Sequence, residues 1–181
     1  MKTDPPRTAK NNHPGISYPV IRADGHVMEK DSELYDFLEG RDRGLPRFET
    51  YSYFPALDGW HRGSSVPGKH ADVPASRWVE FLDELGIHAS VLYPTAGLAL
   101  GLIQSPDWAC IAARAYNSWV AAKYSRAGER LKPVALLPVH DPQEAARELR
   151  RAKVELGLVA GLLPAMTVLN KGYGHRDFDP I

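Results

Sequence analysis

The stretch that decides the fold is residues 19–27, Pro-Val-Ile-Arg-Ala-Asp-Gly-His-Val. Its apolar first half predicts a short strand buried inside a sheet, and the strand ends at an acid, a glycine and an imidazole. Asp24 and His26 are two residues apart, so in an extended backbone their side chains point to the same face. Gly25 lets the backbone bend there. Three apolar side chains are expected inside the sheet: Val20, Ile21 and Ala23.

Two interpretations of this strand end stay open on local sequence alone. A carboxylate beside an imidazole at the carboxyl end of a strand suits a divalent metal. In the alternative, Asp24 caps a turn and His26 faces solvent, and an Asp-x-His triplet is common by chance. The rest of the chain has to decide between them.

The composition predicts one globular domain, or part of a larger one. Of 181 residues, 44% are hydrophobic, which is enough to form a core. The formal net charge is zero, which argues against nucleic-acid or membrane-surface partners bound through charge. The single cysteine, Cys110, excludes an internal disulfide and predicts a reducing, cytoplasmic location. No window suits a transmembrane helix, and residues 1–17 predict a disordered lead-in rather than a secretion signal.

Apolar strands alternate with amphipathic helices along the chain. Strands are predicted at 89–93, 133–137 and 159–163, each followed by a proline. The alternation favours an α/β fold of βαβ units with about four parallel strands and the helices outside. The predicted helices are a short one at 31–38, one capped by Ser76 and ended by Gly86, one opened by Ser105-Pro106 and one opened by Asp141-Pro142.

Residues 40–75 form a long insertion without periodicity, rich in proline, glycine and aromatic residues. An irregular segment of this length inside a compact domain is often a lid or a binding loop. Its two histidines, His61 and His70, are interpreted as loop residues rather than ligands.

The last residues repeat a helix-opening pattern, because Asp179-Pro180 matches Asp141-Pro142. Four strands are about half of an eight-stranded barrel, which needs about 250 residues. We therefore expect residues 18–181 to be the amino-terminal half of a (β/α)₈ TIM-type barrel, interrupted at the start of a helix.

With these elements in place, the sequence resembles the amidohydrolase-related family of metal-dependent hydrolases, which includes aromatic-acid decarboxylases. The order and spacing of the matching pieces carry the resemblance, which covers residues 18–181. The pieces are residues 20–27, 81–87, 91–95, 114–119, 131–138 with Asp141-Pro142, and 178–180.

The resemblance implies a barrel with one divalent metal, zinc or manganese, at the carboxyl ends of its strands. By the family pattern, Asp24 and His26 match the first-strand metal pair, and an acid-x-His pair is similar to the decarboxylase branch. Arg22 departs from a position that is often acidic in the family. The family's other ligands, a later histidine and a later aspartate, have no counterpart before residue 181, so we expect incomplete coordination.

Two reactions stay open for such a metal. It can activate water for hydrolysis, or hold a carboxylate and a neighbouring hydroxyl while carbon dioxide leaves a small cyclic substrate. His140 follows the strand at 133–137 directly and is a candidate for substrate binding, with a rim histidine as the alternative. The catalytic residues are unknown. His88, His175 and Cys110 are interpreted as structural.

Because metal sites usually need three or four protein ligands, we expect the chain alone to be inactive or nearly so. A second hypothesis is a half-barrel remnant that acts only by pairing with itself, as a homo-oligomer, or with a second-half chain, since its sheet has two open edges. A third is an open α/β domain that binds a small molecule without metal.

Overall fold

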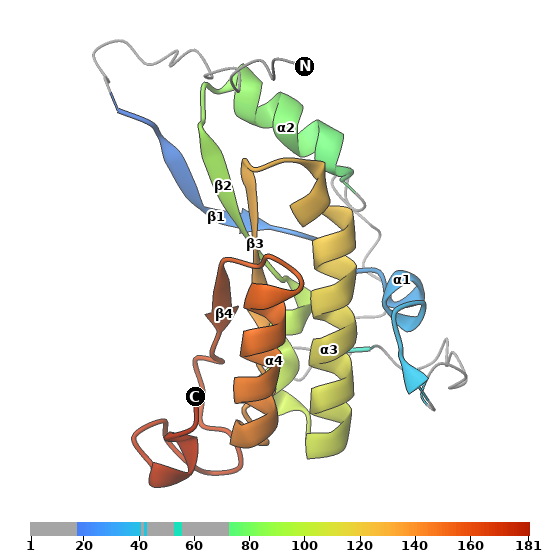
Figure 1. Cartoon of the computed structure of the whole chain (residues 1–181), viewed down its shortest axis with the longest axis vertical. Coiled ribbons are helices and arrows are strands. Elements are labelled where there is room, and N and C mark those ends of the chain that lie inside the picture. Colours follow the sequence, from blue (N-terminus) through green and yellow to red (C-terminus); the bar gives the residue numbers. More distant parts are fainter. Residues whose placement is uncertain (1–17, 41, 43–52, 56–72) are drawn as a thin grey trace.

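The computed structural model describes residues 18–40, 42, 53–55 and 73–181. Its sheet has four parallel strands in the order β1-β2-β3-β4, so consecutive strands are neighbours (Figure 1). This arrangement confirms the predicted α/β class and the parallel pairing. The strands are β1 (Ile21–His26), β2 (Ala89–Tyr93), β3 (Leu131–Leu136) and β4 (Ala160–Leu162).

The helices begin where their capping chemistry allows. The Ser105 hydroxyl accepts from the Trp108 N–H at 3.2 Å, and the Asp141 carboxylate accepts from the two N–H groups that open α4. The Ser76 cap is wrong, because α2 starts one residue earlier, after Pro74. The α-helices are α1 (Asp31–Tyr35), α2 (Ala75–Glu84), α3 (Pro106–Lys123) and α4 (Pro142–Val154), and the 3₁₀-helices are η2 (Ala96–Leu102), η3 (Ser125–Ala127) and η4 (Arg176–Phe178).

The core lies between α3 and the sheet. Alanines of α3 are buried where the helix packs on β3, and the Trp119 indole on the same helix donates to Glu33 of α1. Burial of this apolar surface is the main driving force for the fold. The largest fully buried side chains on the helix and the strands it covers are Tyr116, Trp119, Leu92 and Leu136.

A buried polar network joins α3, α4 and β3. The Asn117 amide donates to the Leu136 carbonyl at 2.9 Å and accepts from the Leu136 N–H at 2.8 Å. It also donates to Glu148 at 2.8 Å, and Arg151 pairs with that carboxylate at 2.7 Å. Every member of the network has a partner, so these buried polar groups do not destabilise the core.

One expectation about local structure is wrong. The strand at residues 19–27 is not buried, because β1 is an edge strand: Ile21 is 59% exposed and Ala23 is exposed. The helix expected to begin at Asp179-Pro180 stays a prediction, because only Ile181 follows in the sequence. Asp179 follows η4, which the His175 ring caps by accepting from the Asp177 N–H at 3.2 Å.

Parts of the predicted domain plan lie outside the described residues. These are the lead-in at 1–17 and most of the 40–75 insertion, with His61 and His70. Within the described part of the insertion, Tyr53 and Phe54 are buried in the core, at 1% and 3% exposure. Among the described residues, no helix is long and apolar enough to cross a membrane.

Candidate metal and substrate site

The side chains of Asp24 and His26 meet at the carboxyl end of β1. His26 Nε2 lies 3.5 Å from Asp24 Oδ1, and the two side chains are 38% and 91% exposed. Both groups are therefore reachable from solvent, as a site for a metal or a substrate at the carboxyl ends of parallel strands requires.

The pairing of β1 with β2 is irregular just before the candidate ligands. Arg22 pairs with Ser90 and Gly25 with Leu92, so β1 has one extra residue between these pairs. The Arg22 guanidinium donates to the Asp24 carbonyl at 3.2 Å and lies over the Trp78 ring at 5.7 Å. Arg22, whose role the sequence did not reveal, thus supports the backbone that presents Asp24.

Gly25 is required where β1 approaches β2 most closely. A Cβ atom on Gly25 would lie 2.6 Å from the Val91 carbonyl oxygen and 2.7 Å from Ser90 Oγ. These separations are shorter than any van der Waals contact, so a side chain at residue 25 would move the strand end that carries both candidate ligands.

The orientation of the His26 ring is set by the turn after β2. His26 Nδ1 lies 2.8 Å from the Pro94 carbonyl oxygen. A carbonyl oxygen can only accept, so Nδ1 carries the hydrogen and Nε2 keeps the lone pair in the neutral ring. The Thr95 hydroxyl is a second, longer neighbour of Nδ1 at 3.4 Å. The Nε2 lone pair is therefore on the side of Asp24. A histidine that binds a metal needs one ring nitrogen with a free lone pair, and Nε2 provides it.

Glu29 joins the end of β1 to the same turn, and sequence reasoning missed it. Its carboxylate accepts from the N–H groups of Thr95, Ala96 and Gly97 at 2.9–3.2 Å. Burial raises the pKa of the Glu29 carboxyl, and the hydrogen bonds from these N–H groups oppose that rise. An acid three residues after His26 is not a signal in the sequence, because its partners lie far along the chain.

The donor pair fits a divalent metal in part. A ligand atom lies about 2.0–2.2 Å from its metal ion, so two ligands of one ion are at most about 4.4 Å apart. The 3.5 Å between His26 Nε2 and Asp24 Oδ1 is within this limit. A carboxylate oxygen and an imidazole nitrogen are also suitable donors for zinc or manganese. Within the described part of the chain, however, no group of three or more metal-binding side chains occurs.

His140 lies just past the carboxyl end of β3, where the sequence placed it. It is buried, at 6% exposure, and neither ring nitrogen has a hydrogen-bond partner among the described residues. Burial lowers the pKa of the His140 ring, and the nearby backbone of Ile103 and Gly101 opposes that fall. His140 therefore offers a neutral ring with unused hydrogen-bonding capacity. It does not join Asp24 and His26 in a described cluster of metal-binding groups.

The remaining candidates have structural surroundings. His88 is exposed, and its N–H donates to the Val20 carbonyl at the amino end of β2. His175 caps η4. Burial and nearby carboxylates raise the pKa of the Cys110 thiol to about 11, so it is not a thiolate nucleophile near neutral pH.

Comparison with known sequences finds similarity to the amidohydrolase family and to two decarboxylases. Residues 93–181 match the amidohydrolase family model. The gamma-resorcylate decarboxylase of Polaromonas sp. (strain JS666) is 35% identical over 95 residues, which are 52% of this chain and 29% of that protein. That of Rhodococcus jostii (strain RHA1) is 32% identical over 105 residues, 54% of this chain and 32% of that protein.

Comparison with solved structures extends the likeness to most of the chain. The dihydroxybenzoic acid decarboxylase of Polaromonas sp. JS666, with bound manganese and 2-nitroresorcinol, has a TM-score of 0.60 and 24% identity over 88% of this chain. The manganese-bound 5-carboxyvanillate decarboxylase of Novosphingobium aromaticivorans has a TM-score of 0.61 and 20% identity over 91% of this chain.

The chain spans less than half of either solved protein, 44% and 46%. At these identities the structural likeness establishes the fold alone, and the family model matches only residues 93–181. Residues 93–181 are thus similar to the amidohydrolase family, and the fold of the chain is that of half of a TIM-type barrel.

Proposed function

We propose that this chain carries the first-strand half of the metal centre of an aromatic-acid decarboxylase, with Asp24 and His26 as ligands. The observation that carries the proposal is the oriented pair, His26 Nε2 facing Asp24 Oδ1 at 3.5 Å while Nδ1 is held by the Pro94 carbonyl. The relatives named above favour decarboxylation over hydrolysis, because they are decarboxylases of hydroxylated aromatic acids.

Asp24 and His26 would hold the cation, which supplies positive charge to bind the substrate carboxylate and a neighbouring hydroxyl oxygen. The exposed position of Asp24 leaves room for such a substrate at the strand ends. His140, whose buried ring has no hydrogen-bond partner among the described residues, would bind a polar group of the substrate. Glu29 and the Pro94 carbonyl keep the His26 ring in place.

Incomplete coordination is part of the proposal. The two donors identified in the described residues are fewer than the three protein ligands that catalytic metal sites usually have. We therefore expect the 181-residue chain to bind Mn²⁺ or Zn²⁺ weakly and to have little or no decarboxylase activity by itself. Release of carbon dioxide from 2,6-dihydroxybenzoate by the purified chain, lost on chelation, would contradict this expectation.

The test is Mn²⁺ binding, measured by the loss of the free-ion electron paramagnetic resonance signal. We expect Asp24→Asn and His26→Ala to weaken binding by about 10-fold or more, on the scale seen when groups of a metal site are removed. His88→Ala is the matched control, because His88 is an exposed histidine at the opposite end of the strands. Equal Mn²⁺ affinity in wild type and His26→Ala would refute the metal site.

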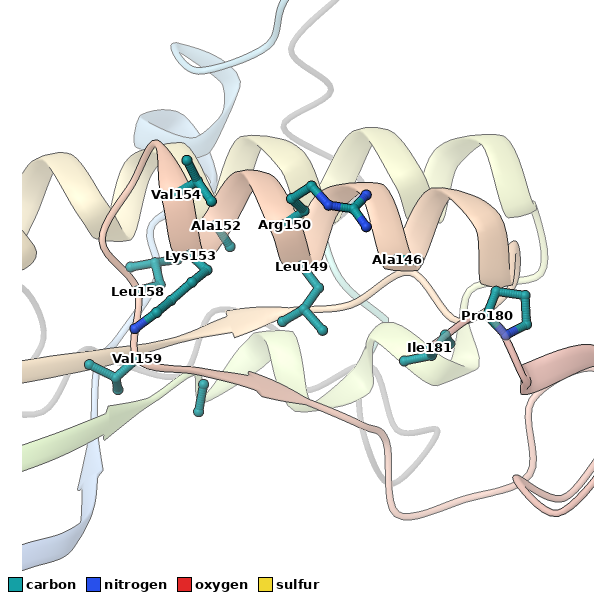
Figure 2. Close-up of a pocket in the computed structure, with 11 residues that line it drawn as sticks. Ala146, Leu149, Arg150, Ala152, Lys153, Val154, Leu158, Val159, Pro180 and Ile181 are labelled. Atoms are coloured by element: carbon teal, nitrogen blue, oxygen red, sulfur yellow. The ribbon is translucent and has the colours of Figure 1, made fainter.

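A second candidate function, self-association of the half-barrel, is favoured by an open apolar groove. The groove has a volume of about 350 Å³ and lies between α4 and the β4 edge of the sheet (Figure 2). Val154 is 76% exposed beside it, and Val159 is 43% exposed. Its other apolar walls include Leu149, Leu158, Pro180 and Ile181, and Arg150 and Lys153 also line it.

Analytical ultracentrifugation tests this candidate. We expect a concentration-dependent dimer that Val159→Lys weakens, because a charge in the groove has to be desolvated when a second copy covers it. Leu85→Lys is the control, since Leu85 is equally exposed, at 44%, but lies after α2 and away from the groove. A monomer at all concentrations would exclude the candidate.

A further inference from the structure

We propose that Glu29 is a positioning residue of the metal centre, fixing the turn at residues 94–97 so that the Pro94 carbonyl holds His26 with Nε2 free. The inference rests on the proposed function only for the identity of the ion, because the positioning itself is a property of the metal-free chain. Glu29 touches neither candidate ligand by hydrogen bond in the described contacts. It acts through the backbone between them.

The Glu29 carboxylate is the hydrogen-bond centre of the turn. Oε2 accepts from Thr95 N–H at 3.1 Å and Ala96 N–H at 3.0 Å, and Oε1 accepts from Gly97 N–H at 2.9 Å. Three successive N–H groups at the start of a helical turn have no partners within that turn. Without Glu29 these N–H groups would be left without hydrogen-bond partners in a partly buried place, which is unfavourable.

The turn has no space to rearrange around a different side chain. A Cβ atom on Gly97 would lie 3.1 Å from Glu29 Oε1, 2.9 Å from Pro94 Cβ and 2.7 Å from Leu136 Cδ1. The turn is thus packed between Glu29 and the end of β3. Because of this packing, the position of the Glu29 carboxylate and the path of residues 94–97 depend on each other.

This turn determines the chemistry of His26. Residues 26 and 93 are paired in the sheet, and the Val27 N–H donates to the Tyr93 carbonyl at 2.9 Å. One residue further, the Pro94 carbonyl accepts from His26 Nδ1 at 2.8 Å. The carbonyl points at the ring only while the backbone of residue 95 stays in its present orientation, which the bond from Thr95 N–H to Glu29 maintains.

The experiment measures the tautomer of His26 directly, by long-range ¹H–¹⁵N correlation spectra of the metal-free 181-residue chain. We expect the Nδ1–H form in wild type. Glu29→Gln replaces one acceptor oxygen with an NH₂ donor that faces backbone N–H groups, so we expect it to shift His26 toward the Nε2–H form. We also expect Mn²⁺ affinity to fall about 10-fold, as for other groups that orient a metal ligand.

Two further variants separate positioning from general stability. Glu33→Gln is the matched control, because Glu33 also makes charged hydrogen bonds, to Trp119 and Lys123, but does not contact the turn. Glu29→Asp keeps the charge and should restore part of the Nδ1–H population. If Glu29→Gln does not fold, Gly97→Ala should produce the same tautomer shift. Gly101→Ala should not, because Gly101 lies outside the turn, although a Cβ there would also be crowded, 2.9 Å from Pro164 Cβ.

Different results overturn the two proposals. An unchanged Nδ1–H tautomer in Glu29→Gln and Gly97→Ala would refute the positioning role, even if Mn²⁺ binds. A tautomer shift in a chain whose wild type binds no Mn²⁺ would support the positioning role and refute the metal site. A shift of equal size in Glu33→Gln would show that any loss of stability moves His26, and would also refute the inference.

Discussion

β1 and β3 belong to the same parallel sheet but differ in how they are held. β3 is covered on both sides: Val134, Ala135 and Leu136 are 2%, 0% and 1% exposed. β1 is an edge strand with an irregular register, and its Ile21 and the Asp24 side chain are 59% and 91% exposed. The strand that supplies stability and the strand that supplies the candidate ligands are therefore different strands.

This division has a physical reason. Ligands must exchange with solvent, so a strand that presents them cannot be covered completely, and it gains less from burial. Its geometry has to be fixed by directed contacts instead. In β1 these contacts are the Arg22 bonds to the Asp24 carbonyl, the close approach at Gly25 and the Pro94 bond to His26.

Truncating one apolar side chain in each strand gives the largest expected contrast. Leu136→Ala leaves a cavity in the core and should lower the free energy of unfolding by about 3 kcal/mol. Ile21→Ala removes a side chain that is already 59% exposed and should cost about 0.5 kcal/mol. Urea unfolding followed by tryptophan fluorescence measures both. Equal losses of unfolding free energy in the two variants would mean that β1 is as buried as β3 in solution, which would contradict the difference between the strands.

Removing the polar support of β3 should have the next largest effect. Asn117→Ala leaves the N–H and the carbonyl of Leu136 without their partner and takes one donor from Glu148, so we expect a loss of about 2 kcal/mol. Ser118→Ala, on the same helix and bonded only to Arg151 in the described contacts, should cost less than about 1 kcal/mol. The same denaturant curves compare the two.

The sequence predicts most of the regular structure because it depends on local signals. The apolar run at β2, the Ser105-Pro106 and Asp141-Pro142 helix starts and the Gly86 stop all have the expected structure, with Gly86 at φ +64°. These signals act within a few residues, so they do not depend on the order of the strands or on distant contacts.

The exposure of β1 could not be predicted in the same way. An apolar run does not state how many neighbours a strand has, and edge position follows from the order of the whole sheet. The roles of Glu29 and Arg22 were also hidden, because their partners at residues 78 and 95–97 are distant in sequence. Asp24, His26 and His140 were found from position alone, and their roles as ligands and substrate contact remain proposals.

A substitution at Gly25 should have a smaller effect and tests whether the backbone of β1 positions the candidate ligands. Gly25→Ala places a methyl group against the Val91 carbonyl and Ser90 Oγ, so we expect a loss of about 1.5 kcal/mol and weaker Mn²⁺ binding. Gly172→Ala is the control, since a Cβ there meets no atom within 4 Å. If Gly25→Ala lowered stability without changing Mn²⁺ binding, the backbone of β1 would not be what positions the candidate ligands.

The smallest expected effect is the pH dependence contributed by His140, at the end of the buried strand. Because burial lowers the pKa of this ring below its ordinary value near 6.5, the unfolded chain binds the proton more readily than the folded one. Its contribution is therefore fully present above about pH 6.5 and is lost as the pH falls toward the folded pKa. We expect the stability of wild type, relative to His140→Asn, to decrease between about pH 7.5 and 5.5. A His88→Asn control, at an exposed residue at the opposite end of the strands, should retain this decrease. A flat difference would mean that the His140 ring is solvated in the folded chain, and would remove the argument that its unpartnered nitrogens are kept for a substrate.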